Sequence, residues 1–537
     1  MGVAKDDQIR LKSSLSSSLP WLGGGLVGGL VLALLDPVDR SVTSVPAYLI
    51  LALFGALALW AVWRWLGAPR ALVAAVIAAV VLRLFLGLAL SRGLPSLGYP
   101  DSKSHQAGYF YLDAFRRDLA SWNLARSSTP LTAAFTERVE TDQYGGLLFI
   151  SGLVYRTLSP TIHRPMLVGS LGAITGGLAV LFTWGFTTTA FGSRSASLAA
   201  WGMALYPEAV LLGASHMREP FLIAFFAAAL YGYALVRAGR LRDGLVAVAI
   251  FLALSALISP PYTLIFAFVL IVAWIWEGYA KRIGGFRLVV LLSVVGLLTL
   301  ALTAGAWSQI GQAPQGSLMD LLDWWVTTGA RYELAKLEQS SGWVQKLFDQ
   351  TPEWAHLPMA TGNGLVQPFL PATLMDTTGA ALSSVIGIWR SLGWFVLLPF
   401  LLYAPFAAFR AKGWRSLQFY LSVVVWVTAL AASFRLAGDQ WDNPRARAVF
   451  LAAQVSIAGW TWVHARGSAS PWLKRIAILV GAGTLSFLSW YAGRYQGFPR
   501  LSLYATSAGY LAFAILFLVG ALLMDRKRRG DLTAGQP

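Results

Sequence analysis

The stretch ALVAAVIAAVVLRLFLGLAL, residues 71–90, is apolar apart from Arg83 and forms most of an apolar run at 70–91. A helix of about 20 such residues crosses the ~30 Å hydrocarbon core of a bilayer. Comparable runs lie near residues 18–35, 46–63, 165–190, 196–213, 219–237, 243–259, 261–278, 286–306, 389–409, 416–433, 447–464, 473–491 and 502–523. The sequence therefore predicts an all-α polytopic membrane protein with about 14 transmembrane helices.

The composition agrees with a membrane protein and excludes several other classes. Of 537 residues, 56% are hydrophobic and only 12% are charged, about half the charged fraction of a soluble protein. The net charge of +17 does not indicate nucleic-acid binding, because the cytoplasmic loops of membrane proteins collect basic residues. The absence of cysteine excludes disulfides and thiolate metal sites, and the five histidines are too scattered for a His-rich metal site.

The positions of the basic residues predict the orientation of the chain. With a cytoplasmic N-terminus, the inner loops hold most of the excess Lys and Arg, provided that the short apolar segment 143–158 does not cross the membrane. We therefore interpret 143–158 as an in-plane helix on the outer surface. This topology predicts a multi-pass protein of the plasma membrane with both termini in the cytoplasm and the active site on the extracytoplasmic side.

Two long loops divide the chain into three predicted parts. Residues 1–306 form an N-terminal transmembrane catalytic module with a first extracytoplasmic loop at 91–165, residues 307–388 form a second long extracytoplasmic loop, and residues 389–537 form C-terminal transmembrane helices. Loops of this length are usually functional or disordered, and aromatic residues argue against disorder. We expect in-plane helices in both loops, with Trp324, Trp325, Trp343 and Trp354 at the membrane surface.

A first candidate for chemistry is Asp101, in LGYPDSKSHQAGYFYLDAFRRDLASW (residues 97–122), just after the third predicted helix. A carboxylate at the lip of an apolar cavity can be desolvated enough to act as a general base. Alternatively, Asp101 caps the interfacial helix that follows it. Arg83, inside the preceding span, is a functional candidate by default, although snorkelling or pairing with Asp101 or Glu219 would also explain it.

A second acid occurs in SHMREP, residues 215–220, on the same predicted side of the membrane. Glu219 precedes Pro220, which suits the first turn of a helix, and an acid there is stabilised by the helix dipole. Glu219 could orient an acceptor or a metal ion while Arg218 reaches a phosphate. The alternative is a structural Arg218–Glu219 pair at a helix start.

A third candidate group lies in GDQWDNPRARAVFLAAQ, residues 438–454, where the chain enters a late helix from the outside. Arg445 and Arg447 break the inward pattern of basic residues. Arginine is well shaped to hold a phosphate through paired hydrogen bonds, which stabilise a leaving phosphate. The alternative is pairing with Asp439, Asp442 or lipid headgroups.

The order and sidedness of these elements resemble the GT-C superfamily of polyprenyl-phosphate-sugar-dependent glycosyltransferases, nearest to protein O-mannosyltransferases and lipid A aminoarabinose transferases. The resemblance covers most of residues 75–240 and 439–455, including the helical hairpin FGSRSASLAAWGMALYP at 191–207. It implies a GT-C-like membrane fold, with Asp101 as catalytic base and Glu219 as second acid. The residues that we predict to bind substrate or phosphate are Arg83, His105, His216, Arg218, Arg445 and Arg447.

The function implied by the resemblance is inverting transfer of a sugar from a polyprenyl-phosphate donor to a lipid, glycan or protein acceptor outside the cell. The predicted partners are that donor, that acceptor and membrane lipids, with no nucleic acid. No cofactor is certain, and a divalent metal ion, if one takes part, would bind Asp101 and Glu219. The alternatives are a flippase or transporter of lipid-linked saccharides, a polysaccharide polymerase, and a structural subunit of a membrane complex.

Overall fold

The computed structural model describes residues 2–40, 42–136, 144–278, 351–376, 378–468 and 470–534. Within these ranges the chain forms helices and connecting turns, with no strand. The helices of the N-terminal half are α1 (Gly2–Leu35), α2 (Ser44–Trp65), α3 (Ala71–Leu97), α4 (Lys103–Gln106), α5 (Leu112–Arg126), η1 (Leu131–Phe135), α6 (Gly146–Leu158), α7 (Pro165–Phe191), α8 (Ser193–Leu205), α9 (Pro207–Gly213), α10 (Glu219–Arg237), α11 (Leu241–Ile258) and α12 (Pro260–Trp276). The later helices are α16 (Glu353–Val366), α17 (Leu370–Met375), α18 (Ala381–Lys412), α19 (Leu417–Leu436), α20 (Asp442–Ala448), α21 (Leu451–Gly467), α22 (Trp472–Tyr495) and α23 (Leu503–Ala534).

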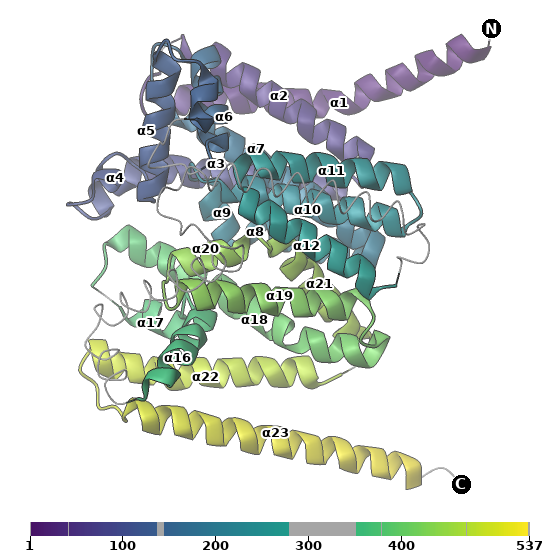
Figure 1. Ribbon diagram of the computed structural model, residues 1–537, viewed down its shortest axis with the longest axis vertical. Coiled ribbons are helices and arrows are strands. Elements are labelled where there is room, and N and C mark those ends of the chain that lie inside the picture. The colour runs from purple at the N-terminus through teal and green to yellow at the C-terminus, as the bar shows by residue number, and fades with distance from the viewer. Residues whose placement is uncertain are drawn as a thin grey trace, which may run out of the picture.

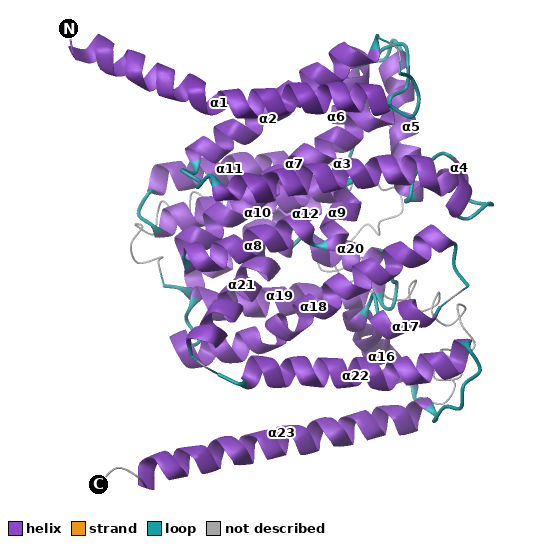
Figure 2. Cartoon of the chain, turned by 180° about the vertical axis from the view of Figure 1, so that it is seen from behind, coloured by secondary structure: helices purple, strands orange, loops and turns teal. Residues whose placement is uncertain are grey.

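The long helices lie side by side in one bundle (Figure 1). In an apolar stretch of 18 residues taken from each helix, 83% of the residues are buried in α7 and 89% in α10. The corresponding shares are 17% in α22 and 6% in α23. The first two therefore form the centre of the bundle, while the last two are apolar helices at its edge, where lipid would cover them. Both marked chain ends lie at one end of the bundle, and α4, α5, α17 and α20 lie at the other (Figures 1 and 2). We call the second the loop end.

The predicted membrane-embedded, all-helical fold is confirmed, but the predicted number of spans is not. Among the described residues, ten helices are long and apolar enough to cross a membrane, or eleven if α20 and α21, bent by 71°, count as one span. α12 is apolar but shorter. The predicted span at 196–213 is divided into α8 and α9 at Pro207, and the predicted span at 286–306 lies outside the described residues.

The two long loops are helical where they are described. In the first, α5 and α6 run across the direction of the bundle helices (Figure 1). α6 (Gly146–Leu158) covers most of the segment 143–158, for which the sequence predicts an in-plane helix. In the second, α16 and α17 precede α18, which begins at Ala381, earlier than predicted. Trp354 in α16 is exposed. The other predicted interfacial tryptophans, Trp324, Trp325 and Trp343, lie outside the described residues.

Candidate functional site

Four charged side chains from three elements converge at the loop end of the bundle. Arg445 of α20 donates from Nε to Glu219 Oε1 at 3.1 Å and from Nη1 to Asp442 Oδ1 at 2.9 Å. Its Nη1 also lies 3.7 Å from Asp113 Oδ2 in the first turn of α5. Glu219 stands at the first residue of α10, where the helix dipole stabilises a carboxylate. We call Asp113, Glu219, Asp442 and Arg445 the open cluster.

The members of the open cluster differ in depth. The Glu219 side chain is 5% exposed and that of Arg445 is 15% exposed. Asp442 is 46% exposed and Asp113 is 55% exposed. Arg445 is therefore anchored by one buried acid and contacted by two acids that water reaches.

A second glutamate–arginine pair lies nearby but is closed to solvent. Arg390 of α18 donates from Nε to Glu208 Oε2 of α9 at 2.5 Å, and these side chains are 1% and 2% exposed. Arg390 also donates to the carbonyls of Gln440 and Trp441, each at 3.2 Å, and its guanidinium lies 4.6 Å from the Trp441 ring. We call Glu208 and Arg390 the closed pair. It ties α9 and α18 to the segment that leads into α20.

Tyr111 lies between the closed pair and the open cluster. The Arg445 guanidinium is 5.7 Å from its ring, and its buried hydroxyl has no hydrogen-bond partner among the described residues. Burial raises the pKa of Tyr111, and the charge of Glu208 raises it further. Among the described residues the hydroxyl is therefore a neutral polar group without a partner, next to the partly exposed Arg445.

Two further predicted arginines, Arg83 and Arg447, are buried and bonded to backbone carbonyls. Arg447 donates to the carbonyls of Leu365 and Gln367 and lies 4.1 Å from the Trp394 ring. Arg83, 2% exposed, donates to Ala79, Met203 and Ala204 carbonyls at 2.8–3.3 Å. Snorkelling of Arg83 and its pairing with an acid, both considered from the sequence, are therefore wrong.

The position of Arg83 follows from the break between α8 and α9. Pro207 has no N–H to donate to the Met203 carbonyl four residues earlier, and it ends α8. A buried carbonyl without a donor costs about 1–3 kcal/mol. Arg83 supplies donors to this carbonyl and to Ala204. Gly213 packs closely against the Arg83 side chain, where a Cβ would lie 2.6 Å from Cδ. Arg83 thus holds the broken helix that carries Glu208.

Asp118 of α5 was not singled out by the sequence. Its side chain is fully buried, and each oxygen has two partners. Oδ1 accepts from the Tyr155 hydroxyl at 2.5 Å and lies 2.9 Å from His216 Nδ1. Oδ2 accepts from the Tyr109 hydroxyl at 2.6 Å and lies 2.7 Å from His163 Nε2. Burial alone would raise the pKa of Asp118, but His216 and His163 hold it well below its usual value.

A sequence signal for Asp118 exists. It is four residues from Ala114 and from Trp122, so all three lie on one face of a helix, and in the structure that face is buried. An acid within an apolar helical stripe requires partners. His163 and His216 supply two of them, but they lie 45 and 98 residues away along the chain.

The remaining predicted residues lie at the loop end but outside the open cluster. Asp101 is exposed on the turn before α4, and Ser102, not Asp101, caps that helix. His105 is buried, accepts from the Tyr99 N–H at Nδ1 (2.9 Å), and has a pKa lowered by burial. Arg218 lies 5.5 Å from the Tyr144 ring, and Glu219 pairs with Arg445. The alternative considered from the sequence, a structural Arg218–Glu219 pair, is therefore replaced by a pair between distant segments.

The described residues do not fit the divalent metal ion considered from the sequence. No group of three or more His, Asp or Glu side chains in those ranges is arranged to hold a metal ion. Glu219 faces Arg445, and Asp101 lies on a separate exposed turn. The mechanism proposed below uses no metal.

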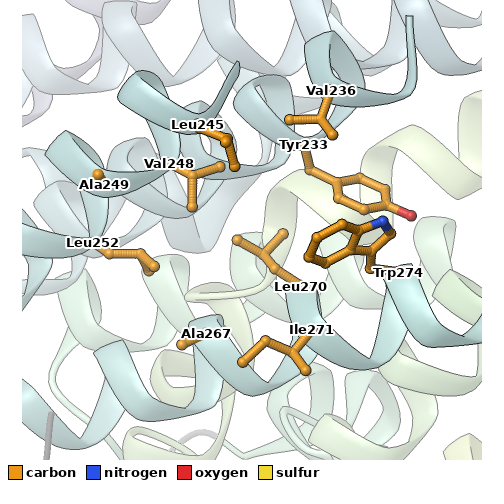
Figure 3. Close-up of a pocket in the computed structure, with 10 residues that line it drawn as sticks. All are labelled: Tyr233, Val236, Leu245, Val248, Ala249, Leu252, Ala267, Leu270, Ile271 and Trp274. Carbon is orange, nitrogen blue, oxygen red and sulfur yellow. The ribbon is translucent and has the colours of Figure 1, made fainter. Parts of the chain in front are cut away.

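A small apolar cavity of about 70 Å³ lies between α10, α11 and α12 (Figure 3). Its residues come from the end of α10, the start of α11 and the second half of α12, so it lies away from the loop end. No charged residue lines it. It is therefore not a candidate for the chemistry of the open cluster.

Comparisons with known proteins give a weak structural likeness only. No family model matches the chain, and no curated protein matches its sequence. The structure of the archaeal oligosaccharyltransferase AglB from Archaeoglobus fulgidus, in complex with an inhibitory peptide and a dolichol-phosphate, is 16% identical, with a TM-score of 0.36, over 82% of this chain and 54% of that chain. The crystal structure of the Archaeoglobus fulgidus oligosaccharyltransferase with Zn and sulfate gives 16%, a TM-score of 0.38, and coverage of 80% and 54%. The chain spans about half the length of these proteins, and its function must be argued from its own residues.

Proposed function

We propose that the protein is a membrane glycosyltransferase of the GT-C type, which moves a sugar from a polyprenyl-phosphate carrier to an acceptor at the loop end of the bundle. The observation that carries this proposal is the open cluster. Arg445 is anchored by buried Glu219 and contacted by two half-exposed acids, Asp442 of its own helix and Asp113 of α5. A partly exposed arginine at the end of a membrane bundle is well placed to bind the phosphate of a lipid carrier.

Arg445 can exchange its exposed acids for a phosphate without losing its anchor. Exposed ion pairs contribute only about 0–1 kcal/mol, so replacing Asp113 and Asp442 costs little. Glu219, which is buried, remains in place and keeps the guanidinium oriented. The bound phosphate would then be stabilised by Arg445 as negative charge develops on the leaving group.

In the proposed reaction an acceptor hydroxyl oxygen bonds to the anomeric carbon while the bond from that carbon to the phosphate oxygen breaks. The hydroxyl proton passes to a carboxylate, and polyprenyl phosphate leaves with the bonding electrons. A single displacement inverts the anomeric configuration, because no covalent sugar–protein intermediate forms. The sequence assigns the base role to Asp101. The contacts support Asp113 better, because it reaches Arg445 while Asp101 lies on an exposed turn.

The proposed setting is the plasma membrane, with the loop end outside the cell and both termini in the cytoplasm. A flippase is less well supported. It would use charged groups near the middle of the membrane, and the buried Arg83 donates to backbone carbonyls at a helix break. The three predicted parts, 1–306, 307–388 and 389–537, remain a proposed division of the chain.

The test is sugar transfer by purified protein in proteoliposomes. The donors are labelled polyprenyl-phosphate hexoses and pentoses, and the acceptors are glycans, lipids and peptides from cell-envelope extracts. The readout is the rate of polyprenyl phosphate release. We expect Arg445→Lys to lower this rate about 100-fold or more, because the ammonium cannot make the paired hydrogen bonds of a guanidinium. Asp101→Asn and Asp113→Asn, compared side by side, identify the base.

The matched control is Arg240→Lys, which alters another exposed arginine–aspartate pair, between α10 and α11, away from the loop end. It should transfer sugar at the wild-type rate. The thermal unfolding midpoint of each variant separates loss of chemistry from loss of folding. Release of polyprenyl phosphate by Arg445→Lys at the wild-type rate, or no release by the wild-type protein from any of these donors, would overturn the proposal.

A further inference from the structure

A cavity of about 240 Å³ opens at the loop end beside the open cluster. Its walls come from the end of α3, the segment 106–110 before α5, and the turn 214–216 before α10. Ala114 of α5 also lines it, and the preceding residue, Asp113, reaches Arg445. A molecule in this cavity would therefore lie next to the proposed phosphate site.

The lining of this cavity favours a neutral, hydroxyl-bearing molecule. No Lys, Arg, Asp or Glu belongs to the residues that line it, so a phosphate headgroup or a charged peptide side chain would find no counter-charge there. Its polar side chains are Ser91, Gln106, Tyr109, Ser215 and His216. The cavity is smaller than the ~300–1,000 Å³ typical of pockets for drug-sized ligands, so it suits a group about the size of one sugar ring.

Aromatic rings complete the match to a sugar. Tyr109 and Phe110 both line the cavity. Aromatic rings offer apolar faces for the C–H groups of a ring, while neighbouring polar atoms bind its hydroxyls. This mixture of uncharged polar groups and aromatic faces differs from the open cluster, where every side chain is charged.

Asp118 fixes two of these wall residues from behind. It accepts from the Tyr109 hydroxyl, and its Oδ1 lies 2.9 Å from His216 Nδ1. Because Nδ1 lies against the carboxylate, Nε2 is the nitrogen of His216 that is left to form a hydrogen bond with a hydroxyl of the ligand. Arg117, the neighbour of Asp118, donates to the His216 carbonyl at 3.1 Å and holds the same turn.

We propose that this cavity binds the acceptor as a neutral sugar, with His216 and Tyr109 as its polar contacts and Asp118 as the residue that positions both. The inference rests on the proposed function and narrows its acceptor from a lipid, glycan or protein to a glycan. Asp118 acts through His216 and Tyr109 and is a positioning residue.

The first experiment measures binding without transfer. Purified protein in nanodiscs, with no donor present, is titrated with methyl glycosides of neutral hexoses and pentoses, and binding is followed by saturation-transfer NMR. We expect at least one glycoside to bind, and His216→Gln to weaken its binding about tenfold, the value of one hydrogen bond of about 1.4 kcal/mol. His464→Gln, which replaces a histidine of α21 outside the cavity lining, should bind as the wild type does.

The second experiment separates the acceptor from the donor. In the transfer assay, His216→Gln should raise the KM for the glycan acceptor about tenfold and leave the KM for the polyprenyl-phosphate donor unchanged. Asp118→Asn should act in the same direction, and His216→Gln keeps the test valid where Asp118→Asn fails to fold. Transfer to a phospholipid or a peptide in preference to a glycan, or an unchanged acceptor KM in His216→Gln, would overturn the inference.

The two proposals fail in different ways. Glycoside binding that depends on His216, in a protein whose Arg445→Lys variant keeps wild-type release of polyprenyl phosphate, would refute the glycosyltransferase proposal and leave the sugar site. Transfer that depends on Arg445, with no glycoside binding and no effect of His216→Gln, would refute the sugar site and leave the glycosyltransferase.

Discussion

The closed pair and the open cluster each contain a glutamate–arginine pair at the same end of the bundle, yet they differ in what they can do. Arg390 and Glu208 are 1% and 2% exposed, and the remaining donors of Arg390 go to backbone carbonyls. Arg445 has the same kind of glutamate partner, but its other contacts are acids about half exposed to solvent. The first arrangement has no exchangeable partner, whereas the second has two.

This difference shows that a glutamate–arginine pair is not in itself a functional site. A buried pair stabilises a fold only while both members are present, because removing one leaves a desolvated charge. A pair with exposed additional partners can trade those partners for a ligand at little cost. The depth of the surrounding groups, which the residue types do not encode, separates a structural pair from a candidate binding site.

The largest effect on stability is expected from removing the arginine of the closed pair, which tests directly whether that pair is structural. Arg390→Met leaves Glu208 as an unpaired buried carboxylate, and we expect the free energy of unfolding to fall by about 3–5 kcal/mol. Thermal unfolding of the detergent-solubilised protein, followed by tryptophan fluorescence, measures the effect. The double variant Glu208→Gln, Arg390→Met removes both charges and should recover most of the loss. Wild-type stability in the single variant would mean that the closed pair does not hold α9 and α18 together.

Arg83 extends the comparison to a buried arginine whose hydrogen-bond acceptors are backbone carbonyls and not an acidic side chain. Arg83→Met leaves the Met203 and Ala204 carbonyls at the helix break without their side-chain donor. We expect a loss of about 1–3 kcal/mol, the cost of unsatisfied buried polar groups, which is less than that for Arg390→Met because no charge is stranded. The same unfolding measurement ranks the two variants. A larger loss for Arg83→Met than for Arg390→Met would contradict the order derived from their partners.

The positions of most helices along the chain could be predicted from the sequence, because apolar runs mark them. The break between α8 and α9 was not predicted, although Pro207 gives a local signal for it. The 71° bend between α20 and α21 could not be predicted, since the sequence Ala448–Val449–Phe450 at that point contains neither proline nor glycine. The residues just before the bend pair with distant segments, Arg445 with Glu219 and Arg447 with the carbonyls of Leu365 and Gln367.

Only part of the candidate site could be predicted from the sequence, because residue type and membrane side can be inferred from it but the contacts between distant segments cannot. Glu219 and Arg445 were singled out by residue type and by the side of the membrane, and the structure brings them together across 226 residues of sequence. Arg218, which the sequence offered only as an alternative partner for Glu219, lies against the Tyr144 ring instead. Asp101 received the base role from the family resemblance, but which acid meets Arg445 depends on the path of the loop. That path carries Asp113 to Arg445 and leaves Asp101 on a separate exposed turn.

The smallest expected effect on stability comes from replacing Asp442. The direction in which this replacement changes the affinity for polyprenyl phosphate is the informative result. Asp442→Asn removes a 46% exposed acid that contacts Arg445 three residues along the chain, so stability should change by less than about 1 kcal/mol. If Asp442 competes with a phosphate for Arg445, this variant should bind a labelled polyprenyl phosphate a few times more tightly than the wild type does. Asp439→Asn is the matched control, because Asp439 accepts from the Trp441 and Asp442 N–H groups and not from Arg445. Weaker binding by Asp442→Asn would show that Asp442 orients Arg445 as Glu219 does. The open cluster would then be a structural arrangement like the closed pair, differing only in its greater exposure to solvent.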